Sequence, residues 1–587
     1  MSQNAFVKKL ARTGKTPRFA AFFFGALLAA ACQPEPGPAG SSASACEGDF
    51  TPLSAVQGTG AATPLLGKSV TVTGIVTLVE ADGVYLEQPH ADALAETSNG
   101  LFLASEDLSA RLAPGDVLVA EGVAAELGAA EDSLTALQDI SDWQICARGT
   151  ELPLTGVALP LTEGQRESLE AMHLKLDQAL VVTDPWGSPS GRLLLSRDQP
   201  LPAPTEVVRP GPDARAQAEQ NRRNALAVLL HESDRQPLPA GTQLLSVQGV
   251  LGHDGDRSRL RVSEAAHAMA PRLYRIEPPA SEDVRVVALN LHNYFNGNGQ
   301  GGGFPTPRGA ATEAEFERQR TRLAAIMGEL SPGLVAVMEL ENDGFGPHSA
   351  AADFARDLAG VSGHEWQAIV PASGSFGDSP ISVGLFYRPD QWIPEGGAEV
   401  LNGPEFRRLS RPPLAQAFQD RASGEVLLVV VNHLKSKGSC PSGGNNANLQ
   451  DGQACWNPAR TLAARAMAEW AKSLAVARAG GRLLVLGDMN AYRMEDPITA
   501  LIEAGLKDLT APSGPRPHFS FIYRGEAGTL DYAFASEALR PFVQSAHILN
   551  VNSTWPPDVE LPFPWLGTSD HDPVVVDLRL RKAVTRD

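Results

Sequence analysis

Two short polar motifs, each at the end of a continuous apolar run, constrain this chain more than any other feature. Gly487-Asp488-Met489-Asn490 follows Leu483-Leu484-Val485-Leu486, and Ser569-Asp570-His571-Asp572-Pro573 precedes Val574-Val575-Val576. Short apolar runs bounded by turn residues predict buried β-strands. The two motifs are therefore expected at strand ends, and two strand ends can share one cleft.

Four further apolar runs carry a polar side chain at one end. Asn290 ends the run from Arg285, Glu339 ends the run from Leu334, His433 lies at the end of the run from Val426, and Asp531 precedes Ala533-Phe534-Ala535. Carboxylate, carboxamide and imidazole groups at converging strand ends hold a hard divalent cation and activate a water beside it. One such residue alone usually only closes a turn. The whole series indicates a catalytic site.

In this order the motifs resemble the endonuclease/exonuclease/phosphatase superfamily of metal-dependent phosphodiesterases, over roughly residues 284 to 580. The chain is most similar to the bacterial extracellular nuclease branch. Supporting stretches are Asn293-Tyr294-Phe295, Met338–Asp343, Arg411–Gln416 and His433–Pro441. The resemblance implies a four-layer α/β sandwich over residues 281–580. Apolar periodicity predicts its helices at Glu313–Leu330, Ala351–Leu358 and Ala459–Ala477.

Phosphodiester hydrolysis needs a cation on a nonbridging oxygen, an in-line water and a stabilised leaving oxygen. Glu339 is the expected anchor for Mg²⁺ or Mn²⁺, with Ca²⁺ as an alternative, because these ions prefer hard oxygen ligands. Asn290 and Asp570 are its expected neighbours. Asp531 and His571 form the expected pair for the general base and phosphate clamp, since a carboxylate fixes the tautomer of an imidazole and raises its basicity.

Three more residues complete the expected catalytic set. Asp488 and Asn490 would hold the attacking water or a second cation, and His433 would donate a hydrogen bond to a phosphate oxygen. Whether Asp488 or His571 accepts the proton stays open at this stage.

The substrate is constrained less than the chemistry. The leading hypothesis is a metal-dependent nuclease that cuts DNA, with RNA as a further substrate and without strong sequence preference. The acidic charge and the aromatic residues near the cleft motivate an alternative phosphoester such as a phospholipid head group or a sugar phosphate. Two departures from the family pattern, Ser379 in place of Asp and Gly567 in place of Arg, keep this alternative open. A third hypothesis is a surface binding protein that has lost activity. Trp555–Pro557 and Phe563–Trp565 either pack their rings on the domain or present them beside the cleft.

The charge of the chain bears on its partners. A net charge of −19 over 587 residues argues against a protein that binds nucleic acid passively, because nonspecific affinity comes mainly from Lys and Arg at phosphates. Nucleic acid is therefore expected as a substrate, and no obligate protein partner is inferred.

The first residues resemble a targeting segment. Basic residues precede the apolar run Phe19–Ala31, which is too short to span a bilayer and predicts an export signal over residues 1–31. Cys32 follows small residues and is expected to be lipidated, which would anchor the protein to a membrane of the cell envelope. Ordinary cleavage after Ala31 or Ala45, and free secretion, is the alternative. Residues 32–50, rich in Pro, Gly, Ser and Ala, are expected to be a flexible tether.

The cysteines agree with export. Apart from Cys32 there are four, and two disulfides are expected, Cys46 with Cys146 and Cys440 with Cys455. The loop closed by the second is expected beside the active site, with Lys435 and Lys437 directed toward phosphate.

Two β-rich domains are expected before the catalytic domain. Short strands over residues 51–147 predict a small barrel, and the stretch resembles the OB-like domain that accompanies extracellular nucleases. Residues 150–272 predict a second β-rich domain, in which Ala214–Leu230 is either a helix or a charged excursion. Pro271–Ser281 is the expected linker.

Overall fold

The computed structural model describes residues 46–580, except 89–95, 130–131, 254–257, 265–266, 272, 274, 407–408, 513–517 and 558. The predicted export signal, Cys32 and most of the predicted tether lie outside the described residues. The chain divides after Gly48, and every element below belongs to the unit that begins at Asp49. In the described part of the chain, no helix combines the length and the apolar character needed to cross a bilayer.

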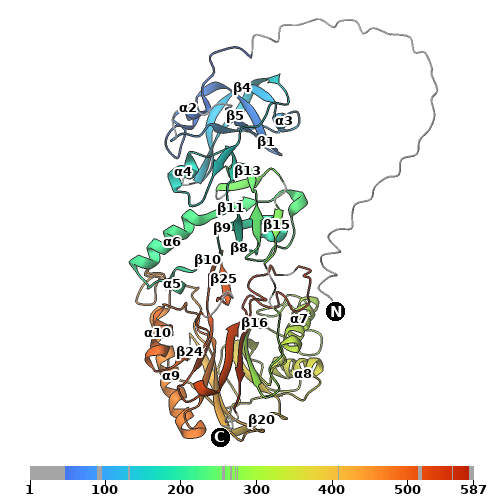
Figure 1. Cartoon of the computed structure of the whole chain (residues 1–587), viewed down its shortest axis with the longest axis vertical. Helices are drawn as coiled ribbons and strands as arrows, with labels where there is room; N and C mark the ends of the chain where they lie inside the picture. The colour runs from blue at the N-terminus through green and yellow to red at the C-terminus, as the bar shows by residue number, and fades with distance from the viewer. Residues whose placement is uncertain are drawn as a thin grey trace, which may run out of the picture. The chain divides into compact units, whose positions relative to one another are not determined.

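The first part of this unit is a closed barrel (Figure 1). Its described strands, in the order β1-β2-β3-β5-β4 around the barrel, are β1 (Ser69–Glu80), β2 (Gly83–Glu87), β3 (Gly100–Ala104), β4 (Val117–Ala129) and β5 (Asp132–Ala147). Alternate apolar residues such as Val72, Val84 and Leu118 fill its interior, together with α2 (Leu53–Gln57) and α3 (Glu106–Ser109). The short strands thus form a barrel; its assignment to the OB type stays a prediction.

The second part is a mixed sheet, called the middle sheet below. Its described strands, in the order β15-β12-β8-β9-β11-β14-β13-β7-β6, are β6 (Thr155–Val157), β7 (His173–Leu176), β8 (Leu180–Asp184), β9 (Arg192–Arg197), β11 (Ala225–Leu229), β12 (Gln243–Leu245), β13 (Gln248–His253), β14 (Ser258–Val262) and β15 (His267–Met269). The helices of this part are α4 (Glu163–Glu167), α5 (Pro204–Val207) and α6 (Pro212–Asn224), with short 3₁₀ turns at Ser188–Ser190 and Glu232–Asp234. The helix expected over 214–230 therefore ends at Asn224, because the apolar residues that follow join the sheet as β11.

The third part contains two mixed sheets. The described strands of sheet I, in the order β18-β19-β17-β16-β29-β28, are β16 (Val284–Tyr294), β17 (Leu334–Glu341), β18 (Gln367–Ala368), β19 (Ile381–Tyr387), β28 (Val543–Ile548) and β29 (Val574–Leu578). Those of sheet II, in the order β20-β21-β22-β23-β27-β24, are β20 (Trp392–Val400), β21 (Arg411–Asp420), β22 (Val426–His433), β23 (Leu483–Asp488), β24 (Lys507–Asp508) and β27 (Asp531–Ala535). The helices are α7 (Glu313–Leu330), α8 (Ala350–Ser362), α9 (Asn457–Ala479) and α10 (Asp496–Glu503), with a 3₁₀ turn at Arg540–Phe542.

The two sheets pack face to face with helices outside. Apolar side chains of both sheets, among them Val286, Leu385 and Val429, form one buried cluster between them. A second cluster joins the outer face of sheet I to α7 and α8, and a third joins the outer face of sheet II to α9 and α10. The layer order is helix, sheet, sheet, helix. A β-rich region followed by an α/β domain with mixed sheets agrees with the predicted fold class.

A small sheet connects the second and third parts. In the described residues its order is β10-β26-β25, with β10 (Leu201–Pro202) from the middle region and β25 (Phe521–Tyr523) and β26 (Glu526–Gly528) from the third part. β10 is parallel to β26, and β25 and β26 form an antiparallel hairpin.

Candidate active site

The strand directions bring the predicted site residues to one edge of the two sheets. β16 and β17 are parallel, as are β22 and β23, so each pair ends at one edge of its sheet. β27 and β29 run antiparallel to β23 and β16 and begin at those same edges. A hydrogen bond from Asn290 Nδ2 to Asp488 Oδ2 at 3.2 Å joins sheet I to sheet II there. His433, Asp488 and Asp531 lie at these strand ends and His571 lies shortly before β29, whereas Asn290 and Glu339 lie inside β16 and β17, a few residues before their ends.

Asp488 lies at the centre of the buried part of this site. Its Oδ2 accepts the hydrogen bond from Asn290 and lies 3.4 Å from His433 Nε2, and its Oδ1 accepts a hydrogen bond from the backbone N–H of Asn490 at 2.8 Å. The Asn490 side chain itself donates to the carbonyl of Leu434 at 3.2 Å. Burial raises the pKa of Asp488 to about 7, although nearby His571 opposes the rise. A carboxylate with a pKa in this range can exchange a proton with water near neutral pH.

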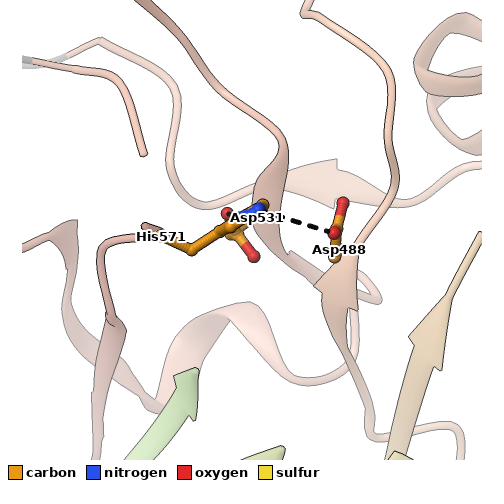
Figure 2. A group of neighbouring side chains, drawn as sticks. All are labelled: Asp488, Asp531 and His571. Carbon is orange, nitrogen blue, oxygen red and sulfur yellow. Dashed lines mark hydrogen bonds and ion pairs between the residues drawn. The ribbon is translucent and has the colours of Figure 1, made fainter. Parts of the chain in front are cut away.

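Asp531 and His571 form a buried hydrogen-bonded pair. His571 Nδ1 lies 2.6 Å from Asp531 Oδ2, and Ser520 Oγ donates to the same oxygen at 2.7 Å. Figure 2 shows the imidazole and the Asp488 carboxylate facing each other, with Nε2 and Oδ2 4.0 Å apart. Burial lowers the pKa of His571, but attraction by Asp531 and Asp570 outweighs it, so this pKa lies well above its usual value. The imidazolium is therefore the favoured form.

His433 has the opposite character. It is 1% exposed, and its Nδ1 is a buried atom without a hydrogen-bond partner among the described residues. Burial and the positive charge of Arg411 hold the pKa of His433 well below its usual value. Its ring is thus neutral, with Nε2 directed at Asp488 and 3.9 Å from Glu339 Oε1.

Two predicted metal ligands lie at the rim of the site. The side chains of Glu339 and Asp570 are 19% and 22% exposed. Glu339 Oε2 accepts a hydrogen bond from the backbone N–H of Asn293 at 3.0 Å, and Asp570 Oδ1 lies 3.9 Å from His292 Nδ1. Ser569 Oγ donates to the Asn290 carbonyl at 2.7 Å and so fixes the Asp570 segment against β16.

The backbone at this edge has an unusual conformation. The β16–β17 pairing shifts register between Asn290 and Tyr294, and non-glycine residues there have positive φ: 56° at His292, 55° at Asn293 and 61° at Glu339. Left-handed backbone costs about 1–3 kcal/mol per such residue and concentrates at functional sites. The bulge lets Asn290 and Glu339, on neighbouring strands, both reach the site.

The donor set fits a hard divalent cation. Within the described residues, one group of three His, Cys, Asp or Glu side chains has ligand atoms within 4.8 Å of one another, namely Asp488, Asp531 and His571. In that same part of the chain Asp531 Oδ1 is buried and has no hydrogen-bond partner. His571, as an imidazolium paired with Asp531, is not available as a ligand. The oxygens of Asp488 and of the predicted ligands Asn290, Glu339 and Asp570 are the ligand chemistry that Mg²⁺, Mn²⁺ and Ca²⁺ prefer.

Arg411, which was not among the predicted site residues, adds positive charge to the site. Arg411 lies opposite His433 in the β21–β22 register and donates to the carbonyl of Leu434 at 3.2 Å. The negative charges of Glu339 and Asp488 attract the Arg411 guanidinium. The positive charges of Arg411 and Arg308 both lower the pKa of His433. The sequence feature that could have indicated Arg411 is its position at the start of β21, the strand directly before β22, which ends at His433.

The predicted cysteine chemistry is present, but one associated lysine was placed wrongly. Cys440 and Cys455 form a disulfide, and Cys46 and Cys146 are both disulfide-bonded. Lys437, expected to point toward phosphate, instead forms an ion pair with the fully buried Glu495. The buried carboxylate needs a cation, and this need decides the direction of the lysine.

Two other predicted features have structural roles. Asp572 is fully buried and accepts hydrogen bonds from residues 550–553, so it anchors that loop. Trp555 is 8% exposed and packs in the cluster outside sheet I, as expected for a ring packed on the domain. Phe563 is 42% exposed and stacks on Trp565 at a centroid distance of 5.2 Å.

A cavity of about 540 Å³ adjoins the rim beside Asp570. Its lining includes His292 and Arg318 of the third part and Trp186, which follows β8 of the middle sheet. The side chain of Trp186 is 40% exposed. A volume of this size lies within the range of about 300–1,000 Å³ found for pockets that enclose small ligands.

Residues 289–571 match the Endonuclease/Exonuclease/phosphatase family. No curated protein matches the chain. Among solved structures, the chain is similar to the human nocturnin catalytic domain with bound sulfate, at 18% identity over 51% of this chain and 93% of that chain, with a TM-score of 0.33. It is similar to a mannosyl-6-phosphatase of Bacteroides thetaiotaomicron, at 17% identity over 50% and 99% of the two chains, with a TM-score of 0.35. It is also similar to D. rerio TDP2 complexed with a single-stranded DNA product, at 12% identity over 51% and 99%, with a TM-score of 0.34. At these values the likenesses say nothing of the substrate.

Proposed function

Because residues 289–571 form a domain of the endonuclease/exonuclease/phosphatase family, whose members hydrolyse phosphoesters, we propose that this chain is a divalent-metal-dependent phosphodiesterase that cuts nucleic acid, DNA above all. The observation that carries the proposal is the convergence of the Asp531–His571 pair, Asp488 and the rim carboxylate of Glu339 at one edge of two sheets. Family membership alone would leave open whether the site is intact.

The cation would be held by Glu339, Asp570 and Asn290, with Asp488 beside them. Bound there, a divalent cation withdraws charge from the phosphoryl oxygen and stabilises the leaving oxygen. The protein residues then divide the remaining tasks of orientation and proton transfer.

Asp488 is the residue that we assign as acceptor of the proton from the attacking water. Its carboxylate is oriented at both oxygens, by the Asn490 amide on Oδ1 and by the Asn290 side chain on Oδ2. His571 donates a hydrogen bond from Nδ1 to Asp531, and its Nε2 points toward Asp488. A phosphate oxygen in front of Nε2 would receive the imidazolium proton as a charge-assisted hydrogen bond.

Nucleic acid is favoured by aromatic and basic groups around the site. The Phe521 ring lies 4.7 Å from the His571 ring, Tyr523 follows on the same strand with 55% of its surface exposed, and Arg524 lies 5.3 Å over the Tyr523 ring. Exposed rings beside a scissile phosphate are surfaces on which bases stack. Arg411 and Arg308 provide local positive charge in an otherwise acidic protein.

The cavity lined by Trp186, Arg318 and Asp570 supports a second candidate, a small phosphoester such as a sugar phosphate or a lipid head group. A cavity of this volume lined by two arginines, Arg318 and Arg322, suits a compact anionic substrate better than a long strand. The same residues would perform the hydrolysis.

The test is incubation of the mature protein with plasmid DNA, RNA, bis(p-nitrophenyl) phosphate and a phospholipid panel in Mg²⁺, Mn²⁺ or Ca²⁺, with a chelator control. Metal-dependent cleavage of DNA, absent in His571→Ala, supports the proposal. Cleavage of lipid or sugar phosphate without cleavage of nucleic acid would establish the second candidate. No hydrolysis of any phosphoester would leave the binding-protein hypothesis.

Export and lipidation of Cys32 are proposed on separate grounds. The basic and apolar segments before Cys32 support an export signal, and disulfides such as Cys440–Cys455 persist mainly in oxidising compartments. A lipid on Cys32 would hold the enzyme at the cell envelope.

A further inference from the structure

The middle region contributes a short segment to the third part of the chain, Leu201–Val207, called the strap below. It contains β10 and α5 and lies well before the family match at residues 289–571. Leu201 and Pro202 pair in parallel with Glu526 and Ala527 of β26. The backbone N–H of Ala203 donates to the carbonyl of Ala527 at 2.8 Å and continues this ladder. The strap is therefore bonded to the hairpin that leads into Asp531.

Glu206 of the strap binds two loops at once. One carboxylate oxygen accepts hydrogen bonds from Arg493 Nε and Thr529 Oγ1, both at 3.0 Å. The other accepts from the backbone N–H of Thr529 at 2.9 Å and from that of Arg493 at 3.3 Å. Its side chain is 9% exposed. These four hydrogen bonds to one buried carboxylate fix the positions of Glu206, Arg493 and Thr529 relative to one another.

These two loops carry the catalytic centre. Thr529 precedes Asp531 by two residues, and Arg493 follows Asn490 by three. The two loops also contact each other directly. The backbone N–H of Met489 donates to the carbonyl of Leu530 at 2.8 Å, and Arg493 Nη2 donates to Thr529 Oγ1 at 2.9 Å. Asp488 and Asp531 are partners in the β23–β27 ladder, so Glu206 adds to these contacts from outside the family match.

The strap has a second contact on the same loop. Thr205 Oγ1 donates to Glu495 Oε1 at 2.7 Å, and the backbone N–H of Met494 donates to the Thr205 carbonyl at 2.9 Å. Glu495 is fully buried and paired with Lys437. The strap thus holds the loop after Asn490 by backbone and by side chain.

We infer that Glu206 is a positioning residue of this active site, which sets the distance between the Asp488–Asn490 loop and the Asp531–His571 pair. It touches neither substrate nor cation and acts only through Arg493 and Thr529. The inference rests on the proposed phosphodiesterase function, because it concerns the geometry of that same site. Misplacement of reacting groups by about 1 Å can lower a rate about 100-fold.

The test compares Glu206→Ala, Glu206→Gln and Glu206→Asp in the full chain. Glu206→Ala removes all four hydrogen bonds and is expected to lower kcat for bis(p-nitrophenyl) phosphate about 10- to 100-fold per folded molecule, with KM changed less than threefold. Glu206→Gln keeps an acceptor for the Thr529 amide and is expected to recover most of kcat. If Glu206→Ala does not fold, Glu206→Asp, one methylene too short to reach both loops, takes its place.

Glu80→Ala is the matched control. The Glu80–Arg261 pair, at 2.6 Å and 20% and 17% exposed, joins β1 of the barrel to β14 of the middle sheet. Its loss is expected to lower stability without changing kcat per folded molecule. Equal kcat in Glu206→Ala and wild type, or an equal loss in Glu80→Ala, would overturn the inference.

A readout without substrate separates this inference from the proposed function. The proton shared by His571 and Asp531 at 2.6 Å is expected as a downfield NMR resonance of histidine-labelled protein, assigned by its loss in His571→Ala. Glu206→Ala should shift or broaden it, whereas Glu80→Ala should not. If wild type hydrolyses no phosphoester but the resonance responds in this way, the proposed function fails and the positioning role stands. An unchanged resonance refutes the positioning role.

Discussion

Arg285 and Asp577 form a buried ion pair whose removal has a predictable cost. Arg285 Nε and Nη2 donate to the two Asp577 oxygens at 2.7 and 3.0 Å, and Nη1 donates to the carbonyls of Glu277 and Leu330 at 2.8 and 3.0 Å. Among the described residues, Arg285→Met leaves Asp577 buried with Ser545 as its remaining side-chain donor. Loss of one partner of a buried pair costs about 3–5 kcal/mol. The double variant Arg285→Met/Asp577→Leu leaves no charge and the same two unpaired carbonyls as Arg285→Met, at about 1–3 kcal/mol for each carbonyl that is buried, so it should lose less stability than Arg285→Met by the cost of the unpaired carboxylate.

The measurement is urea unfolding followed by circular dichroism, with the free energy of unfolding taken from midpoint and slope. With a slope of about 3 kcal/mol per M, the midpoint of Arg285→Met should fall by about 1–1.7 M. The double variant should be more stable than Arg285→Met although it carries an additional substitution. A double variant that is less stable, or a loss below about 1 kcal/mol in Arg285→Met, would refute this account of the pair.

Four further outcomes are expected. Glu339→Ala and His571→Ala should each lower kcat about 10²- to 10⁴-fold or more with little change in melting temperature; wild-type cleavage by either excludes the proposed mechanism. Burial raises the pKa of Glu87, which is 2% exposed, from 4.5 to about 7, so its own contribution to stability is complete below pH 4.5 and is lost, by at most about 3 kcal/mol, as pH rises through 7. Other buried carboxyls such as Glu170 titrate in the same range, so the loss of urea midpoint between pH 4.5 and 8 should be smaller in Glu87→Gln than in wild type but not absent, and an equal loss in both contradicts this assignment. Tyr523→Ala should raise KM for an oligonucleotide about 5- to 150-fold, as expected for one lost stacked base, but leave bis(p-nitrophenyl) phosphate kinetics unchanged; equal effects on both substrates contradict stacking. Cell fractionation should find wild type in the membrane fraction and Cys32→Ser in the soluble fraction or medium, and identical distributions rule out the lipid anchor.

The strand-end residues could be predicted because their signal is local. An apolar run followed by Asn290, Glu339 or Asp488 is visible in a few residues of sequence, and burial of such runs is forced by the hydrophobic effect. Helix α7 was predicted with its observed bounds, Glu313–Leu330, and in the structure Thr312 and Glu315 form a capping box at its start, which is a local device. These features depend little on the rest of the chain.

Other features depend on partners far away in sequence and were not predicted. The direction of Lys437 depends on Glu495, 58 residues later, and the role of Glu206 depends on Thr529, 323 residues later. A contact between residues so far apart in sequence leaves no pattern in the residues around either partner. Arg411 belongs to the same class, because its effect on His433 follows from strand register rather than from sequence spacing.

The adjacency of β16 and β29 bears on when activity can arise during biosynthesis. Arg285 and Asp577, paired across these strands, are 292 residues apart, and His571 lies just before β29. A nascent chain that ends after β28 still lacks Asp570, His571 and β29, so its site is incomplete. Since strands so distant in sequence also pair slowly, a chain translocated during or soon after translation would cross the membrane before its site is assembled.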